Sequence, residues 1–113
     1  MLHLSSVIEL IRYQQEDGRE PYTAWFRSLR DRMAKARIEA RLHQIEYGNL
    51  GDCKPVGEGV TELRIHVGAG YRVYCGQRGQ RIVILLCGGD KDSQARDIAR
   101  AKVLWADWKL RQP

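Results

Sequence analysis

The feature that most constrains the fold is a series of three strand-like segments joined by short glycine-containing turns. Glu62–Val67 alternates polar and apolar residues, Tyr71–Cys75 follows after a turn with two glycines, and Ile82–Cys87 is continuously apolar. Alternation is typical of a strand with one buried face, and continuous apolarity favours a central strand covered on both faces. Tight glycine turns connect antiparallel neighbours. The pattern therefore predicts a three-stranded antiparallel meander.

One strand and two helices are predicted before the meander. Val and Ile in Ser6–Tyr13 favour a strand, and Pro21 suits the first turn of a short helix over Tyr22–Leu29. Asp31 is a candidate N-cap for a second helix, whose core-facing stripe has members three or four residues apart: Ala34, Ile38, Leu42 and Ile45. The segment Gly48–Gly59 is expected to be a loop between this helical hairpin and the meander.

A last helix is predicted after the meander. Asp90, Asp92 or Ser93 can cap it, and its apolar stripe is spaced by three, four and three: Ile98, Ala101, Trp105 and Trp108. The order of elements predicts an α+β fold in which the N-terminal strand completes a four-stranded, mainly antiparallel sheet. With no repeat, low-complexity tract or long linker, we expect residues 1–113 to form one domain.

Composition narrows the partners and the cellular location. The formal net charge of +5 favours a polyanionic partner. The apolar run Ile82–Cys87 is far shorter than the ~20 residues that a membrane-spanning helix needs, and Met1–Leu10 contains no Lys or Arg, which argues against a signal peptide. We therefore expect a cytoplasmic protein with no membrane partner.

The arrangement of the cysteines, and the absence of the common nucleotide-binding and hydrolase motifs, argue against several kinds of site. Cys53, Cys75 and Cys87 are odd in number and form no CxxC, so neither a disulfide scaffold nor a metal site is expected. Cys75 and Cys87 fall within strand-like runs and are predicted to be small buried apolar residues. The chain has no Walker loop, GxGxxG, HExxH or GxSxG, so no cofactor is predicted.

Cationic and aromatic side chains are concentrated on two neighbouring strands of the meander. Arg64 and His66 share the polar face of one strand, and Arg72 and Tyr74 share a face of the next. If the register brings the two pairs side by side, a basic patch results, and Lys91 after the last strand could close one side of it. Guanidinium groups match the geometry of phosphate oxygens, so the patch suits a phosphodiester.

Such a patch could cleave RNA without a metal ion. A base would take the proton of a 2′-hydroxyl that attacks the adjacent phosphorus, and an acid would protonate the leaving 5′-oxygen. His66 could act as acid or base, and Lys91 could donate a proton or stabilise charge. Simpler alternatives remain for several of these residues: Arg64 can pair with Glu62 or Glu58, and an exposed histidine is commonly only solvated. Tyr71 and Tyr74 are more often packing residues, and Lys54 can be a solvated side chain or a phosphate contact.

Three stretches resemble the addiction-module killer proteins, HigB-like or phage-derived Gp49-like toxins of the RelE/ParE superfamily. They are Gly51–His66, Gly70–Tyr74 and Leu86–Ile98, and the resemblance runs from about Val7 to Trp105. It implies a four-stranded sheet against an N-terminal helical hairpin. RelE-like members are ribosome-dependent mRNA endoribonucleases that a small antitoxin holds inactive. The implied partners are a cognate small helix-turn-helix antitoxin, the ribosome and mRNA, with DNA bound only through the toxin–antitoxin complex.

The resemblance also implies roles for individual residues. Arg72 corresponds to a phosphate-contacting arginine, and Arg64 and Lys91 fall at or near the positions of basic residues in the family. These three, with His66, are the candidate catalytic residues, and the candidate RNA contacts are Lys54, Tyr71, Tyr74 and Gln94. RelE-like and HigB-like nucleases commonly carry a Tyr or His near the start of the last helix, where this chain has Gln94, Arg96 and Asp97.

Two alternatives to an endoribonuclease stay open on the sequence. ParE-like members share the fold but inhibit DNA gyrase, and need no nuclease residues. A relative without activity would bind only its antitoxin. Function within a superfamily follows the site and not the fold, so the arrangement of the basic residues is the feature to test.

Overall fold

A five-stranded mixed sheet, in the order β1-β5-β4-β3-β2, is the frame of the computed structural model, which describes residues 7–112. Its strands are β1 (Glu9–Arg12), β2 (Cys53–Gly57), β3 (Val60–Ile65), β4 (Tyr71–Arg78) and β5 (Ile82–Gly89). β1 runs parallel to β5, and the other neighbours are antiparallel. The predicted meander and the α+β class are confirmed, and β5 is buried along nearly its whole length.

The sheet has five strands and not four, because part of the predicted loop forms β2. Cys53 pairs with Leu63 and Lys54 with Glu62. The Cys-Lys-Pro-Val-Gly segment lacks alternation and contains Pro55, which has no N–H for a ladder hydrogen bond. Proline is tolerated there because β2 is an edge strand, and the register shifts between Pro55 and Gly57.

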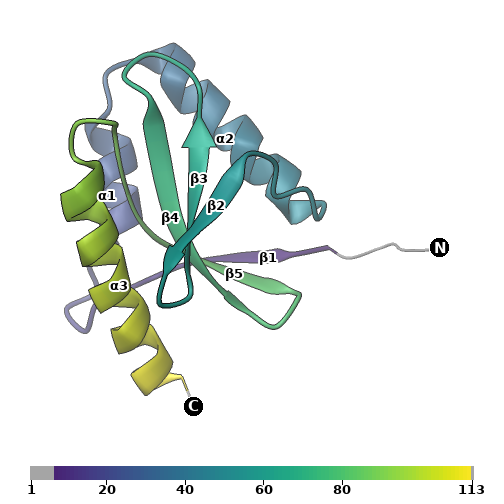
Figure 1. Cartoon of the computed structure of the whole chain (residues 1–113), viewed down its shortest axis with the longest axis vertical. Coiled ribbons are helices and arrows are strands. Elements are labelled where there is room, and N and C mark those ends of the chain that lie inside the picture. Colours follow the sequence, from purple (N-terminus) through teal and green to yellow (C-terminus); the bar gives the residue numbers. More distant parts are fainter. Residues whose placement is uncertain (1–6, 113) are drawn as a thin grey trace.

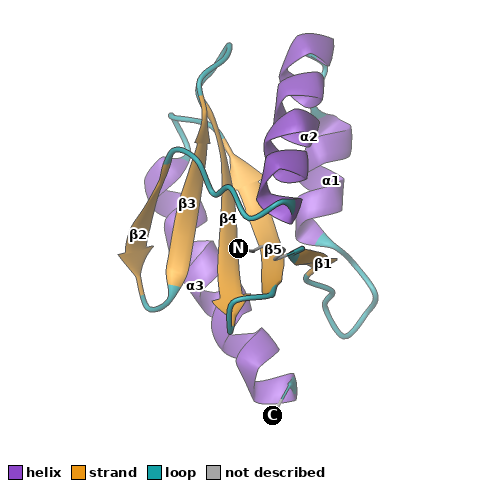
Figure 2. Ribbon diagram, turned by 90° about the vertical axis from the view of Figure 1, so that its right-hand side faces the viewer, coloured by secondary structure: helices purple, strands orange, loops and turns teal. Residues whose placement is uncertain are grey.

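Three helices cover the two faces of the sheet. α1 (Pro21–Ser28) and α2 (Arg32–Glu46) lie on one face, and α3 (Gln94–Arg111) lies on the other (Figures 1 and 2). All three predicted helices are confirmed. The Asp31 side chain accepts a hydrogen bond from the Ala34 N–H at 3.0 Å, which is the predicted N-cap.

Alternation along the strands gives each face its own core. The hairpin face packs against α1 and α2 and consists of Leu63, Ile65, Val73, Cys75, Val83 and Leu85. The α3 face consists of Val60, Tyr74, Ile84, Leu86 and Cys87. The predicted stripe of α2 is fully or nearly fully buried, and Cys75 and Cys87 are buried as predicted. Burial raises the pKa of each of these two thiols to about 12.

The tryptophan pair of α3 covers one half of the α3 face. Trp105 is buried over Gly76, where an added Cβ would lie 2.4 Å from the indole ring. Trp108 stacks on Trp105 with a centroid separation of 5.3 Å. The other half of the α3 face, near the first turn of α3, is not apolar. It holds the polar side chains described next.

Candidate functional site

Strand pairing brings the predicted basic residues together. Arg64 on β3 lies directly opposite Arg72 on β4, and Glu62 lies opposite Tyr74 two residues along. On its other side Glu62 pairs with Lys54 of β2. Residues directly opposite one another in an antiparallel ladder point to the same face. The side chains of Lys54, Glu62, Arg64, Arg72 and Tyr74 therefore all lie on the α3 face.

Glu62 lies at the centre of this group and is fully buried. Its Oε2 accepts hydrogen bonds from the Tyr74 hydroxyl at 3.1 Å and from the Gln94 side-chain amide, in the first turn of α3, at 2.8 Å. Arg64 Nε lies 3.5 Å from Glu62 Oε1, and Arg72 Nε lies 3.8 Å from Oε2. We call Glu62, Arg64, Arg72, Tyr74 and Gln94 the Glu62 cluster. Its single carboxylate forms ion pairs with two guanidinium groups on the side of their inner nitrogens, while Glu62 Oε1, Arg64 Nε and Arg72 Nε are buried and make no hydrogen bond within residues 7–112.

The outer nitrogens of the two arginines differ in their hydrogen bonding. Arg72 Nη1 donates to the carbonyl of Gly70 at 2.6 Å, whereas the Nη atoms of Arg64 make no hydrogen bond within residues 7–112. The Arg64 side chain is 32% exposed and that of Arg72 is 15% exposed. Burial and the Glu62 carboxylate raise the pKa of Tyr74, so that phenol remains a neutral donor.

Lys91 comes to the same end of the sheet from the turn after β5. Its main-chain N–H donates to the Ala69 carbonyl at 3.4 Å. A Cβ added at Gly70 would lie 3.3 Å from Arg72 Nη1 and 3.6 Å from Lys91 Cβ. Gly70 has a φ of +73°, which disfavours any other residue. Lys91, itself exposed, therefore borders the Arg72 guanidinium across this glycine.

His66 lies just after β3, and its ring contacts a carboxylate from the segment before β2. His66 Nε2 is hydrogen-bonded to Asp52 Oδ2. The Asp52 carbonyl accepts the main-chain N–H of Arg64 at 3.0 Å, so the pair is anchored beside the Glu62 cluster. The hydrogen bond to His66 lowers the pKa of Asp52, and the cations Arg64 and Arg41 lower it further.

The four candidate RNA contacts are not equally placed. Lys54 is exposed on β2 next to Glu62, and Gln94 is half-buried within the Glu62 cluster. Tyr74 is fully buried, so it supports Glu62 and presents no surface to a base. Tyr71 lies on the hairpin face, with its ring 6.3 Å from that of Trp25. The structure therefore brings Tyr71 to the opposite face from the arginines.

Two acidic residues of this region were not among the predicted site residues. The sequence could have identified Glu62 as a site residue, because alternation in Glu62–Val67 places it on the same strand face as Arg64. Its complete burial was not visible, since it depends on where Gln94 docks. Asp52 could not be found, because its approach to His66 depends on the pairing of a strand that was expected to be a loop.

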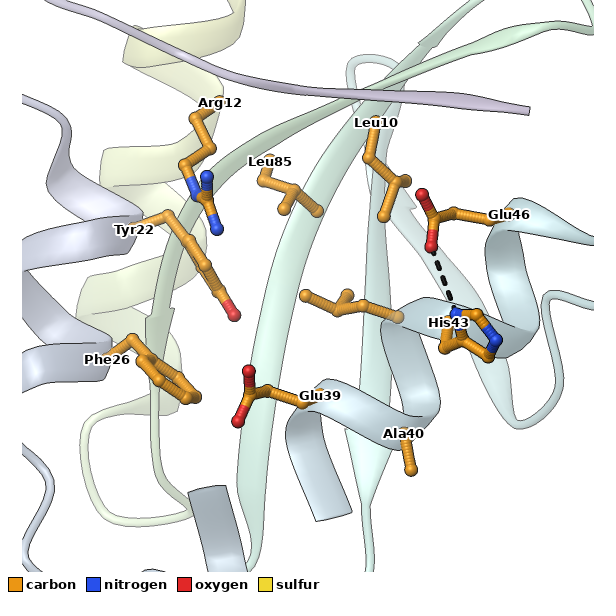
Figure 3. A pocket seen from close by; sticks show the side chains of 10 residues that line it. Leu10, Arg12, Tyr22, Phe26, Glu39, Ala40, His43, Glu46 and Leu85 are labelled. Atoms are coloured by element: carbon orange, nitrogen blue, oxygen red, sulfur yellow. Dashed lines mark hydrogen bonds and ion pairs between the residues drawn. The ribbon is translucent and has the colours of Figure 1, made fainter. Parts of the chain in front are cut away.

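A separate cavity of about 590 Å³ lies on the hairpin face (Figure 3). Its walls come from Tyr22 and Phe26 of α1 and from Glu39, His43 and Glu46 of α2. His43 Nδ1 lies 3.3 Å from Glu46 Oε1, as the dashed line in Figure 3 marks. The cavity shares no residue with the Glu62 cluster and contains neither of its arginines.

The described residues contain no site of the metal-binding kind. No group of three or more His, Cys, Asp or Glu side chains within residues 7–112 could hold a metal ion. The three cysteines are free thiols. In the same part of the chain, no helix is both long and apolar enough to cross a bilayer.

Comparison with known proteins gives the class. The family model described as "Phage derived protein Gp49-like" matches residues 24–106, which include every residue of the Glu62 cluster, Asp52, His66 and Lys91. An "Uncharacterized protein" of Haemophilus influenzae (strain ATCC 51907 / DSM 11121 / KW20 / Rd) is 48% identical over 83 residues, which cover 74% of this chain and 84% of the relative. The chain therefore belongs to the phage-derived Gp49-like family, a family of RelE/ParE-like toxins. A toxin of this kind has an antitoxin as its partner.

Proposed function

We propose that this toxin is a metal-independent, ribosome-dependent mRNA endoribonuclease that arrests translation and growth. The observation that carries the proposal is the pair Arg64 and Arg72, which lie opposite one another on adjacent strands and both form ion pairs with the buried Glu62. Guanidinium groups on neighbouring strands present planar forks of donors, which match a phosphate in both shape and charge.

The local charge supports a phosphodiester as the ligand. Arg64, Arg72 and Lys54 lie around the buried Glu62 carboxylate, and Lys91 borders Arg72, so four basic residues stand against the carboxylates of Glu62, Asp52 and the buried Asp97. The net charge of +5 acts in the same direction at longer range. Donors aimed at the phosphate oxygens strengthen as charge develops on them in the transition state, so both arginines would accelerate phosphoryl transfer.

The proposed reaction needs only the side chains at this end of the sheet. The 2′-hydroxyl loses its proton to His66 as its oxygen bonds to the adjacent phosphorus. The bond from phosphorus to the 5′-oxygen breaks, and that oxygen takes a proton from the Lys91 ammonium. The products are a 2′,3′-cyclic phosphate and a 5′-hydroxyl. Arg64 and Arg72 stabilise the charge on the non-bridging oxygens.

The remaining parts of the proposal concern partners and location. We propose a cytoplasmic protein of one domain over residues 1–113, held inactive by a cognate small helix-turn-helix antitoxin, with DNA contacted only through the toxin–antitoxin complex. Lys54 and Gln94 are the proposed additional RNA contacts on the α3 face. Tyr74 is proposed to act through Glu62, to which it donates a hydrogen bond, and Tyr71 would meet RNA only on the opposite face.

The test is induced expression of wild type and Arg72→Ala, with growth, translation and mRNA 5′ ends measured. We expect Arg72→Ala to reduce cleavage about 10²–10³-fold, the effect of removing one transition-state donor. Because Arg72 also touches buried Glu62, the more exposed Arg64→Ala is made in parallel, and urea unfolding checks both folds. Arg30→Ala, at an exposed loop position, is the control and should keep full activity.

Three outcomes would contradict the proposal. Undiminished cleavage by well-folded Arg64→Ala and Arg72→Ala would remove both arginines from the chemistry. Inhibition of gyrase supercoiling with intact mRNA would favour the ParE-like alternative. Normal growth despite abundant folded protein would favour an inactive relative. The side chain of Gln94 is the observation that keeps these alternatives open, because an amide cannot transfer a proton where relatives carry Tyr or His.

A further inference from the structure

Asp52 is held in place from two sides through its backbone carbonyl. The main-chain N–H of Arg64 donates to it at 3.0 Å, and Arg41 Nη2, from α2, donates at 2.6 Å. The neighbouring Gly51 has a φ of +63°, and a Cβ added there would lie 2.8 Å from the Arg41 guanidinium. The backbone from which the Asp52 side chain extends is therefore held jointly by α2 and β3.

The Asp52 carboxylate contacts Nε2 of His66 and not Nδ1. The pKa of Asp52 is lowered by this hydrogen bond first and then by Arg64 and Arg41, the two cations that face the pair from β3 and α2. An ionised carboxylate only accepts hydrogen bonds, so Nε2 carries the ring hydrogen. In the neutral imidazole, Nδ1 is then left as the acceptor.

Nδ1 of His66 is open to a ligand. Within residues 7–112 it has no hydrogen-bond partner, and the His66 side chain is 73% exposed. The ring is thus held through one nitrogen while the other has no hydrogen-bond partner, two residues along the chain from Arg64. A carboxylate that accepts a hydrogen bond from the second ring nitrogen fixes the orientation and tautomer of an imidazole. It also stabilises the imidazolium that forms on proton transfer.

We propose that Asp52 is the positioning residue for His66, fixing the tautomer in which Nδ1 takes the proton of the attacking 2′-hydroxyl. This inference rests on the proposed endoribonuclease function. The proton moves from the 2′-oxygen to Nδ1, the bond from that oxygen to phosphorus forms, and the bond to the 5′-oxygen breaks. Asp52 touches no substrate atom and acts only through the imidazole.

The chain offers an internal reference for the tautomer. His43 pairs with Glu46 through Nδ1, at 3.3 Å, so its contact involves the opposite ring nitrogen. Both pairs are exposed histidine–carboxylate contacts, but the His43–Glu46 pair lies on the hairpin face, away from the arginines. ¹⁵N NMR of the histidine rings in the full chain distinguishes the two tautomers, with assignments made from His66→Gln and His43→Gln.

In wild type, we expect the neutral His66 ring to carry its hydrogen on Nε2, and Asp52→Ala to weaken this preference measurably. Asp52→Ala and Asp52→Asn should lower cleavage of ribosome-bound mRNA about 10–100-fold, as loss of an orienting partner does, and should change the pH profile of the reaction. Asp52→Glu should restore part of the rate. Glu46→Gln, the matched control, should alter the His43 signals alone and leave cleavage unchanged.

The two readouts separate this inference from the proposed function. A His66 tautomer unaffected by Asp52→Ala would overturn the inference, whatever the cleavage rate. Full cleavage by Asp52→Ala and Asp52→Asn, with the tautomer altered, would overturn it as well, because His66 would then not be the base. Absence of mRNA cleavage by wild type would overturn the endoribonuclease itself and the catalytic role of His66 with it, while the tautomer readout would still report whether Asp52 orients the ring.

Discussion

The two faces of the sheet bury different chemistry. The hairpin face is apolar throughout its centre, where Leu63 and Val73 pack against α2. The α3 face is apolar only around Trp105 and, near the first turn of α3, encloses the Glu62 carboxylate with two guanidinium groups. Leu63 and Glu62 are adjacent on β3 and equally buried, so the contrast lies in surroundings and not in depth.

The difference between the two faces indicates that the α3 face carries the functional site. Apolar residues of similar volume would stabilise the α3 face at least as well, because desolvation of charges offsets much of their attraction. A buried carboxylate that contacts Arg64 and Arg72 is therefore best explained by what it holds in position. The hairpin face needs no such explanation, since packing accounts for its residues.

The largest expected effect comes from changing the adjacent residues Glu62 and Leu63. Glu62→Leu should lower the free energy of unfolding by about 3–5 kcal/mol, because it leaves two partly buried guanidiniums without their carboxylate. Leu63→Ala should lower it by about 2–5 kcal/mol through lost packing. Urea unfolding measures both.

The two losses should respond differently to removal of the arginines. Adding Arg64→Met and Arg72→Met to Glu62→Leu should recover a substantial part of its loss, because no uncompensated charge then remains. The same two substitutions should not rescue Leu63→Ala. An unrescued Glu62→Leu would mean that the cluster is held by packing alone, and the contrast between the faces would not stand.

The apolar side of this contrast could be read from the sequence. Alternation and glycine turns predicted β3, β4 and β5, and spacing predicted the buried stripe of α2. β2 was missed because Cys-Lys-Pro-Val-Gly carries no periodic signal, and its pairing is set by the neighbouring β3.

The polar side could be predicted only in part. Arg64 and Arg72 were identified because alternation assigns residues to faces. Alternation does not say which polar residue a distant helix will cover, so the burial of Glu62 under Gln94 was not predicted. The contact between Asp52 and His66 joins residues 14 positions apart, and it follows only from the pairing of β2 with β3.

Gly88 and Gly76, one on each face, test the packing of the two faces in the same way, with smaller expected effects on stability. An added Cβ at Gly88 would lie 2.2 Å from the Trp25 ring, beneath α1, and one at Gly76 would lie 2.4 Å from the Trp105 ring, beneath α3. Gly88→Ala and Gly76→Ala should each lower the free energy of unfolding by about 1–3 kcal/mol, because the rings must shift. Equal losses would show that both faces are closely packed where they are apolar. A neutral Gly76→Ala would show that α3 docks loosely and would weaken the account of how Glu62 becomes buried.

The smallest expected effect separates Tyr22 from Tyr74, two of the three tyrosines that are buried within residues 7–112. Burial raises the pKa of Tyr22, on the hairpin side, to about 12, and burial together with Glu62 raises that of Tyr74 on the α3 face. A phenol whose folded-state pKa is raised contributes stability that is present below about pH 10 and is lost as the pH rises through the folded-state pKa. At pH 7, Tyr74→Phe should lower the free energy of unfolding by about 1 kcal/mol, because Glu62 loses a donor. Tyr22→Phe should change it by no more than about 0.5 kcal/mol.

Each substitution should also reduce the loss of stability at alkaline pH relative to wild type. The buried thiols of Cys75 and Cys87 contribute to this pH dependence equally in all three proteins. Urea unfolding at pH 7 and between pH 9 and 11 measures both effects, and equal behaviour of the two variants at pH 7 would mean that the Tyr74–Glu62 hydrogen bond contributes nothing to the α3 face.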